Sequence, residues 1–239
     1  MIEIKDIQRT YRQGDIEVHA LRGVDLSIGS GEFTALAGPS GSGKTTLLNL
    51  IGCLDKPDHG SIVIDNQSVT ALGRNAAAAF RLDQIGFVFQ SYNLLPVLTA
   101  YENAEFVLML QGMDAKKRKD IVVPLMERVG LTDEMGRKPH QLSGGQQQRV
   151  AIVRAIANRP GFVLADEPTA NLDSETSRSL VELMKELNRE SGITFVFSTH
   201  DPLVMEASTR LVQMESGRII GDSAATALSE KSDTERTEA

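Results

Sequence analysis

The strongest chemical signal in the sequence is a glycine-rich loop, GPSGSGKTT, at residues 38–46. It fits the pattern Gly-x4-Gly-Lys-Thr, in which the glycines let the backbone curl so that successive N–H groups point at phosphate oxygens. The lysine is expected to reach the β- and γ-phosphates of a nucleotide, and the threonine hydroxyl is expected to ligate magnesium. We therefore predict a site for ATP and Mg²⁺ at Gly38, Pro39, Ser40, Gly41, Ser42, Gly43, Lys44, Thr45 and Thr46.

Two carboxylates, Asp166 and Glu167, directly follow the apolar run at residues 162–165. In an open α/β sheet, ligands bind at the carboxyl ends of the strands. Asp166 is expected to hold magnesium through a water molecule, and Glu167 is expected to orient or deprotonate the water that attacks the nucleotide. The alternative is that the pair only caps the next helix, but the phosphate loop favours the catalytic interpretation.

A third motif, LSGGQQQR at residues 142–149, precedes the apolar stretch 150–156. Ser143 followed by two glycines indicates the N-terminus of a helix, where backbone N–H groups lack intrahelical partners and attract anions. A second anion site is more than one phosphate loop requires. The motif is therefore either such a site or a simple helix cap.

The elements that must position these motifs can be identified from the apolar pattern. Continuous apolar runs at 33–37, 161–165 and 193–197 predict buried parallel strands, because a sheet covered on both faces needs them. Residues 173–190 carry apolar side chains at spacings typical of an amphipathic helix. Strand, helix and strand in this order predict an α/β fold. That helix stripe comprises Leu180, Leu183, Met184 and Leu187.

The remaining segments predict two additions to this α/β core. Residues 1–32 and 60–89 contain alternating runs that predict antiparallel strands flanking the main sheet. Residues 91–158 are predicted to form a helical insert, although Pro124 leaves the boundaries of its helices open. Residues 223–239 have few large apolar side chains and are predicted to be a disordered tail.

Composition narrows the classes of function. A chain of 239 residues can bury one full core, and its net charge of −7 argues against nucleic acid as a partner. Cys53 is the single cysteine, so no intrachain disulfide is expected and a reducing compartment is favoured. We expect no secretory signal and no membrane span, because no apolar stretch approaches 18 residues. Any role at a membrane is therefore expected to depend on a partner protein.

Taken together, these motifs resemble those of the ATP-binding cassette (ABC) ATPases. LSGGQ at residues 142–146 is similar to the signature motif of that family and falls between the two nucleotide motifs. Tyr11 resembles the aromatic residue that stacks on adenine, and Gln90 resembles the magnesium-sensing glutamine at the junction with the helical insert. Residues 170–173 resemble the loop after the catalytic glutamate. His200 resembles the switch histidine that contacts the γ-phosphate.

The resemblance covers residues 1–222 and implies a phosphate-loop ATPase with a mixed core sheet, an antiparallel N-terminal β subdomain and a helical insert. The core is placed at about 1–90 and 159–222, and the insert at about 91–158. The implied catalytic residues are Glu167 and His200, and the implied metal ligands are Thr45, Gln90 and Asp166. The family works as a head-to-tail pair, which implies that each ATP is also contacted by Ser143, Gly144, Gly145 and Gln146 of the partner subunit.

Within the family, the closer resemblance is to cassettes of the lipoprotein-releasing and macrolide-exporter type. It rests on GCLDKP at 52–57, IGFVFQ at 85–90 with NLLP at 93–96, residues 141–152 and residues 164–169. It implies separate transmembrane permease subunits and a location on the cytoplasmic face of the inner membrane.

Two small departures from the pattern, Val153 and Ala170, touch no inferred catalytic role. The apolar segment 91–98 either receives a permease helix or packs within the insert. Two rival functions also stay open. One is a soluble ABC ATPase in cluster assembly or cell division. The other is a regulator that binds nucleotide without hydrolysing it, which Glu167 and His200 argue against.

Overall fold

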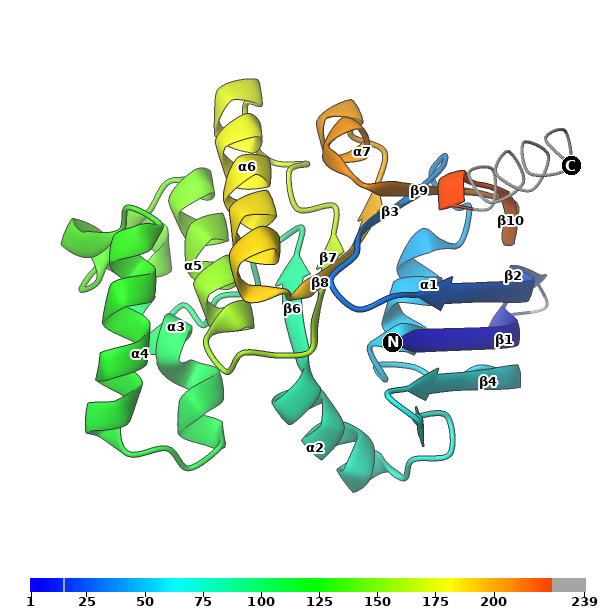
Figure 1. The fold of residues 1–239 in the computed structure, drawn as a ribbon, viewed down its shortest axis with the longest axis horizontal. Coiled ribbons are helices and arrows are strands. Elements are labelled where there is room, and N and C mark those ends of the chain that lie inside the picture. The colour runs from blue at the N-terminus through cyan, green and yellow to red at the C-terminus, as the bar shows by residue number, and fades with distance from the viewer. Residues whose placement is uncertain (15, 225–239) are drawn as a thin grey trace, which may run out of the picture.

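Two β-sheets and the helices around them form the part of the chain that the structure, a computed structural model, describes: residues 1–14 and 16–224 (Figure 1). The core sheet runs in the order β10 (Arg218–Asp222), β9 (Arg210–Glu215), β3 (Phe33–Ala37), β8 (Thr194–Thr199), β7 (Phe162–Asp166) and β6 (Ile85–Phe89). All of these strands are parallel to their neighbours except β10, which pairs antiparallel with β9. The three predicted core strands are thus confirmed, and every residue of β3 and β8 is buried.

The second sheet is antiparallel and runs in the order β2 (Ile16–Ile28), β1 (Ile2–Gln13), β4 (His59–Ile64) and β5 (Gln67–Ser68). Its inward side chains share one apolar cluster with helix α1 (Lys44–Ile51) and with the core strands. In the view of Figure 1, α1 lies between this sheet and the core sheet. The helix that begins at the phosphate loop is therefore fixed by both sheets.

The prediction of flanking antiparallel strands is confirmed for residues 1–32 and for β4 and β5, but it is wrong for residues 74–89. There the chain forms helix α2 (Arg74–Gln84), and β6 then joins the core sheet parallel to β7. Four consecutive alanines, residues 76–79, favour the helix. The apolar run of β6 suits a strand inside a parallel sheet rather than a half-exposed antiparallel one.

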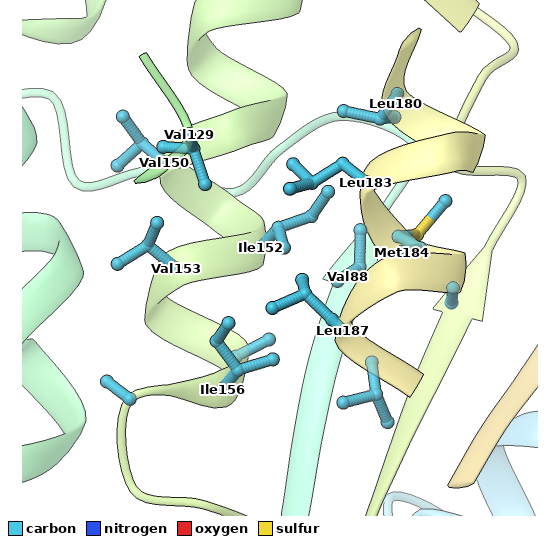
Figure 2. Close-up of a cluster of buried hydrophobic side chains, with 14 of the residues drawn as sticks. Val88, Val129, Val150, Ile152, Val153, Ile156, Leu180, Leu183, Met184 and Leu187 are labelled. Carbon is cyan, nitrogen blue, oxygen red and sulfur yellow. The ribbon is translucent and has the colours of Figure 1, made fainter. Parts of the chain in front are cut away.

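The predicted helical region contains α3 (Ala100–Leu110), α4 (Ala115–Arg128), the short 3₁₀ helices η1 (Thr132–Glu134) and η2 (Pro139–Gln141), and α5 (Gly144–Ile156). Helix α6 (Ser174–Ser191) carries the predicted apolar stripe and turns it toward α5 (Figure 2). Because β6, α5 and α6 share this cluster, the helical region packs continuously onto the core. Helix α7 (Pro202–Ala207) follows β8.

Pro124 lies inside α4 without ending the helix. Proline lacks a backbone N–H, so the carbonyl of Asp120 loses its usual helical donor. Both residues are on the exposed side of α4, where water can satisfy that carbonyl, whereas Val122 and Met126 are buried on the opposite side. The helix therefore continues through the proline because its inward face stays apolar.

No helix within residues 1–14 and 16–224 combines the length and the apolar character that crossing a membrane requires. The predicted disordered tail, residues 223–239, lies outside the described residues from position 225 onward.

Candidate nucleotide-binding site

An open cleft of about 950 Å³ lies between the β1–β2 hairpin, the phosphate loop and the carboxyl ends of the core strands. It gathers predicted site residues that are distant in sequence, namely Tyr11, Pro39, Ser40, Gly41, Ser42, Gly43, Lys44, Thr45, Thr46, Gln90, Glu167 and His200. Residues that sequence reasoning missed also line it: Glu17, Val18, His19, Ala20, Arg22 and Ser216. They come mainly from β2, where the alternating pattern predicted a strand but gave no sign that one end borders a cleft.

The phosphate loop adopts a conformation that requires glycine. Gly38, Gly41 and Gly43 have φ angles of 155°, 78° and 102°, a region that side chains disfavour. A Cβ atom at Gly38 would lie 2.1 Å from the carbonyl oxygen of Met214, and one at Gly43 would lie 2.5 Å from that of Ala20. Helix α1 begins directly after this loop, and no side chain caps it. Its first residues, Lys44, Thr45 and Thr46, line the cleft, so backbone N–H groups at the helix N-terminus are available to an anion there.

Lys44 and Thr45 connect the loop to its surroundings. Lys44 is a buried residue, and its ammonium group donates to the carbonyl oxygens of Gly38 and Pro39, at 2.7 and 3.0 Å. The Thr45 hydroxyl donates to Asp166 Oδ1 at 3.0 Å, across 121 positions of sequence. A lysine ammonium held against the loop can contact phosphate oxygens, and a hydroxyl beside a carboxylate offers the oxygen ligands that Mg²⁺ prefers.

Glu167 and His200 lie together at the ends of β7 and β8. Glu167 Oε1 is 2.7 Å from His200 Nδ1, and the Glu167 N–H donates to the carbonyl of Ser198 at 2.8 Å. Glu167 has a φ of 45°, unusual for a residue with a side chain, so its backbone turns sharply out of β7. The Glu167 side chain is 15% exposed and that of His200 is 70% exposed. This pair places a carboxylate and an exposed imidazole on the cleft.

Gln90 follows β6 and borders the cleft, and its backbone carbonyl accepts a hydrogen bond from Asn171 at 2.9 Å. Beyond Ser91, Tyr92 and Asn93 have positive φ angles. Their carbonyls both accept hydrogen bonds from the guanidinium group of Arg154 on α5, at 2.8 and 2.6 Å. Burial lowers the pKa of Arg154 from its ordinary value. Helix α5 thus fixes the segment that leaves Gln90.

Ser143, Gly144, Gly145 and Gln146 do not line the cleft. Ser143 caps α5: its Oγ accepts from the Gln146 N–H at 3.2 Å, and Gln146 Oε1 accepts from the Ser143 N–H at 2.9 Å. A Cβ atom at Gly144 would lie 2.8 Å from the Tyr92 hydroxyl, and one at Gly145 would lie 2.5 Å from Thr176 Cγ2. Within one chain, this motif is a helix cap packed closely against its neighbours.

Among residues 1–14 and 16–224, no group of three or more His, Cys, Asp or Glu side chains could hold a metal ion by itself. The oxygen donors at the phosphate loop nevertheless fit Mg²⁺ bound with a nucleotide, because such ions use one or two protein oxygen ligands together with phosphates and water. Asp166 and Thr45 supply two protein oxygen atoms at the phosphate loop. Gln90, the third predicted ligand, borders the same cleft.

Comparison with known proteins identifies the class. Residues 21–170 match the family model described as ABC transporter. The chain therefore belongs to the ABC transporter family, and it is an ATP-binding, ATP-hydrolysing cassette of the kind that powers transport.

Particular relatives give a finer comparison. The chain is 46% identical to the lipoprotein-releasing system ATP-binding protein LolD of Anaeromyxobacter dehalogenans, over 92% of this chain and 93% of that protein. It is also 46% identical to the macrolide export ATP-binding/permease protein MacB of Syntrophobacter fumaroxidans, over 94% of this chain but only 32% of that longer protein.

A solved structure supports the same fold. The ATP-binding cassette MJ0796 of Methanocaldococcus jannaschii, a dimer in a post-hydrolysis state bound to ADP and Pi, superposes with a TM-score of 0.87 at 43% identity. The comparison covers 93% of this chain and 97% of the other. The predicted fold class, an ABC ATPase with a mixed sheet and antiparallel N-terminal strands, is thereby confirmed.

Proposed function

We propose that this chain acts as a pair of ATPase subunits that power separate permease subunits from the cytoplasmic face of the inner membrane. The single observation that carries the proposal is the cleft, which unites the phosphate loop with the Glu167–His200 pair. In this proposal residues 1–222 form one ABC ATPase domain, with a core at about 1–90 and 159–222 and a helical insert at about 91–158.

Each part of the cleft has a role in ATP hydrolysis. Lys44 and the N–H groups of the phosphate loop hold the phosphates, and Thr45, Asp166 and Gln90 hold Mg²⁺, which neutralises phosphate charge when it is bound. Glu167 orients and deprotonates the attacking water, because its carboxylate follows β7 and lines the same cleft as the phosphate loop. His200 is exposed and contacts Glu167, so it is placed to bind the γ-phosphate.

The second subunit is needed because Ser143 to Gln146 lie outside the cleft of their own chain. In a head-to-tail pair, Ser143, Gly144, Gly145 and Gln146 of the partner subunit close over the ATP. ATP then favours the closed pair through contacts with both subunits, and hydrolysis removes those contacts. The dimeric state of the related cassette MJ0796 supports this arrangement.

Replacing Glu167 with glutamine tests both parts of the proposal. We expect Glu167→Gln to lower the turnover number for ATP by at least about 100-fold, because a general base is lost. We also expect it to dimerise in saturating ATP and Mg²⁺, since hydrolysis no longer reopens the pair. The measurements are steady-state ATPase activity and sedimentation velocity.

Glu182→Gln is the matched control, because Glu182 is an exposed carboxylate on α6 that pairs with Lys185 at 3.6 Å and does not line the cleft. It should keep full activity. A Glu167→Gln variant that stays monomeric in saturating ATP and Mg²⁺ would contradict the paired model, and one with unchanged turnover would contradict the catalytic role.

Relatives named for lipoprotein release and macrolide export support a permease-linked function of that type. The rival is a soluble ABC ATPase that works without a permease. Purification from membranes separates the two, because only a permease-linked subunit is recovered with an integral membrane protein. Recovery entirely in the soluble fraction, with no membrane partner, would favour the rival.

A further inference from the structure

Arg9 on β1 bridges two carboxylates beside the predicted adenine-stacking residue. Its Nε and Nη2 donate to Asp55 at 3.0 and 2.9 Å, and its Nη1 donates to Asp58 Oδ1 at 2.7 Å. The guanidinium carbon lies 4.7 Å from the centre of the Tyr11 ring. The Arg9 side chain is 22% exposed, and its guanidinium group is bound to Asp55 on one side and to Asp58 on the other. It therefore covers the Tyr11 ring in a fixed orientation.

The Tyr11 hydroxyl is held by the same carboxylate. It donates to Asp55 Oδ2 at 2.9 Å, and Asp55 Oδ1 also accepts from the Lys56 N–H at 2.7 Å. Asp55 thus accepts four hydrogen bonds, two of them from Arg9, which immobilise its carboxylate. The Tyr11 ring is therefore restrained at its hydroxyl and covered by Arg9.

The second carboxylate is fixed independently. Asp58 Oδ2 accepts from the Thr10 N–H at 2.6 Å. That backbone hydrogen bond, followed by the hydrogen bond from Arg9, holds the pKa of Asp58 below its ordinary value, so Asp58 stays charged at neutral pH. Arg9 is consequently paired with one carboxylate on each side of its guanidinium group.

Asp55 also connects this cluster to the phosphate loop. It lies in the turn that ends α1, where the Leu54 N–H donates to the carbonyl of Asn49 at 2.9 Å. The other end of α1 begins at the phosphate loop. The Tyr11 ring and the phosphate loop, which both line the cleft, are therefore connected through Asp55 and α1.

We propose that Arg9 and Asp55 are positioning residues for the base of the nucleotide. They hold the Tyr11 ring so that the face away from Arg9 is presented to the base in the cleft. This inference rests on the proposed function as an ATPase and on the sequence-based expectation that Tyr11 stacks on adenine. A ring that is already ordered loses little freedom when the base binds, whereas a mobile ring weakens binding about 3- to 10-fold.

The test compares two ligands that share phosphates but differ in the base. Isothermal titration measures the affinity of the full chain for ATP and for inorganic tripolyphosphate, both with Mg²⁺. We expect Arg9→Gln and Asp55→Ala to weaken ATP binding about 3- to 10-fold. Tripolyphosphate binding should stay unchanged in both variants, because it does not involve Tyr11.

Arg128→Gln is the matched control, since Arg128 on α4 pairs with Glu190 at 2.7 Å and neither residue lines the cleft. It should bind both ligands as the unmodified chain does. Arg9→Lys, which keeps the charge but loses the planar contact with Asp55, should weaken ATP binding in the same direction. It provides the test if Arg9→Gln fails to fold, as shown by its melting curve.

Equal weakening of ATP and tripolyphosphate would overturn the inference, because it would show a structural effect transmitted to the phosphate loop. Unchanged binding of ATP to both variants would also overturn it. Two other results concern the proposed function instead: an unmodified chain that does not bind ATP, or a Tyr11→Ala variant that binds ATP normally. Either result would refute the adenine site, and with it the role of Arg9 and Asp55.

Discussion

Asn103 is a fully buried side chain near the start of α3, and its amide holds the loop before that helix. Its Oδ1 accepts from the Leu95 N–H at 2.7 Å. Its Nδ2 lies 3.1, 3.2 and 2.9 Å from the carbonyl oxygens of Leu95, Leu98 and Thr99. An amide NH₂ has two hydrogens, so Asn103→Ala removes about three net hydrogen bonds.

The magnitude follows from these bonds. At about 1 kcal/mol each, their loss lowers the free energy of unfolding by about 3 kcal/mol. The greater helix propensity of alanine returns about 0.5 kcal/mol. We therefore expect a net loss of about 2.5 kcal/mol, which corresponds to a fall in melting temperature of about 5–10 °C in a chain of this size.

Urea unfolding followed by circular dichroism measures this free energy, with an unchanged m-value expected if only the native contacts are lost. Asn188→Ala is the control, because Asn188 on α6 donates to only two carbonyls, those of Gly31 and Ile193, at 2.9 and 2.8 Å. A loss at Asn103 below about 1 kcal/mol, or no larger than that at Asn188, would refute the assignment of these bonds as the support of the loop.

Two further predictions concern the permease and the effect of pH. Leu95 is 37% exposed on the loop held by Asn103. Leu95→Asp should leave ATP binding by the isolated chain intact but abolish the stimulation of ATPase activity by the permease. Loss of ATP binding in this variant would indicate a structural role instead. The hydrogen bond from Arg210 to Asp222, at 2.7 Å, holds the pKa of Asp222 below its ordinary value. A lowered carboxylate pKa stabilises the fold above the unfolded-state pKa near 4, and this stabilisation is lost as pH falls through the folded-state pKa. Asp222→Asn should therefore lower the melting temperature more at pH 7 than at about pH 3, and an equal effect at both pH values would contradict this.

The phosphate loop could be predicted from sequence because its chemistry restricts residue type at each position. The backbone must curl tightly, which requires glycine at Gly38 and Gly43, where the structure shows positive φ angles and carbonyl oxygens within 2.5 Å of a Cβ position. The prediction of the core strands succeeded for a related reason, since burial of both faces of a sheet requires continuous apolar runs. Local rules sufficed for these features.

Features that depend on tertiary context could not be predicted in the same way. The contact between Glu167 and His200 follows from the parallel register of β7 and β8, in which Asp166 is opposite Ser198. No local pattern specifies that register. The wrong prediction for residues 74–89 has a different origin, because local signals were present there: the four alanines at residues 76–79 favour a helix, and the continuous apolar run of β6 suits a parallel sheet.

The cluster around Arg9 is harder still to predict, because arginine and aspartate usually form exposed ion pairs that contribute little to stability. The position of Arg9 over the Tyr11 ring and of Asp55 at the Tyr11 hydroxyl depends on how β1 passes the turn after α1. A signal existed only in GCLDKP at residues 52–57, which supported the family resemblance without indicating what its aspartate contacts.

The signature motif shows how two interpretations that the sequence left open are compatible. The structure makes Ser143 a helix cap, in which its Oγ accepts the Gln146 N–H. A serine hydroxyl has one hydrogen to donate in addition to its acceptor lone pairs. The cap uses only an acceptor site, so the hydroxyl hydrogen is still available to a phosphate oxygen. Capping therefore does not compete with anion binding; it orients Ser143 at the helix N-terminus, where a nucleotide held by a second subunit can meet it.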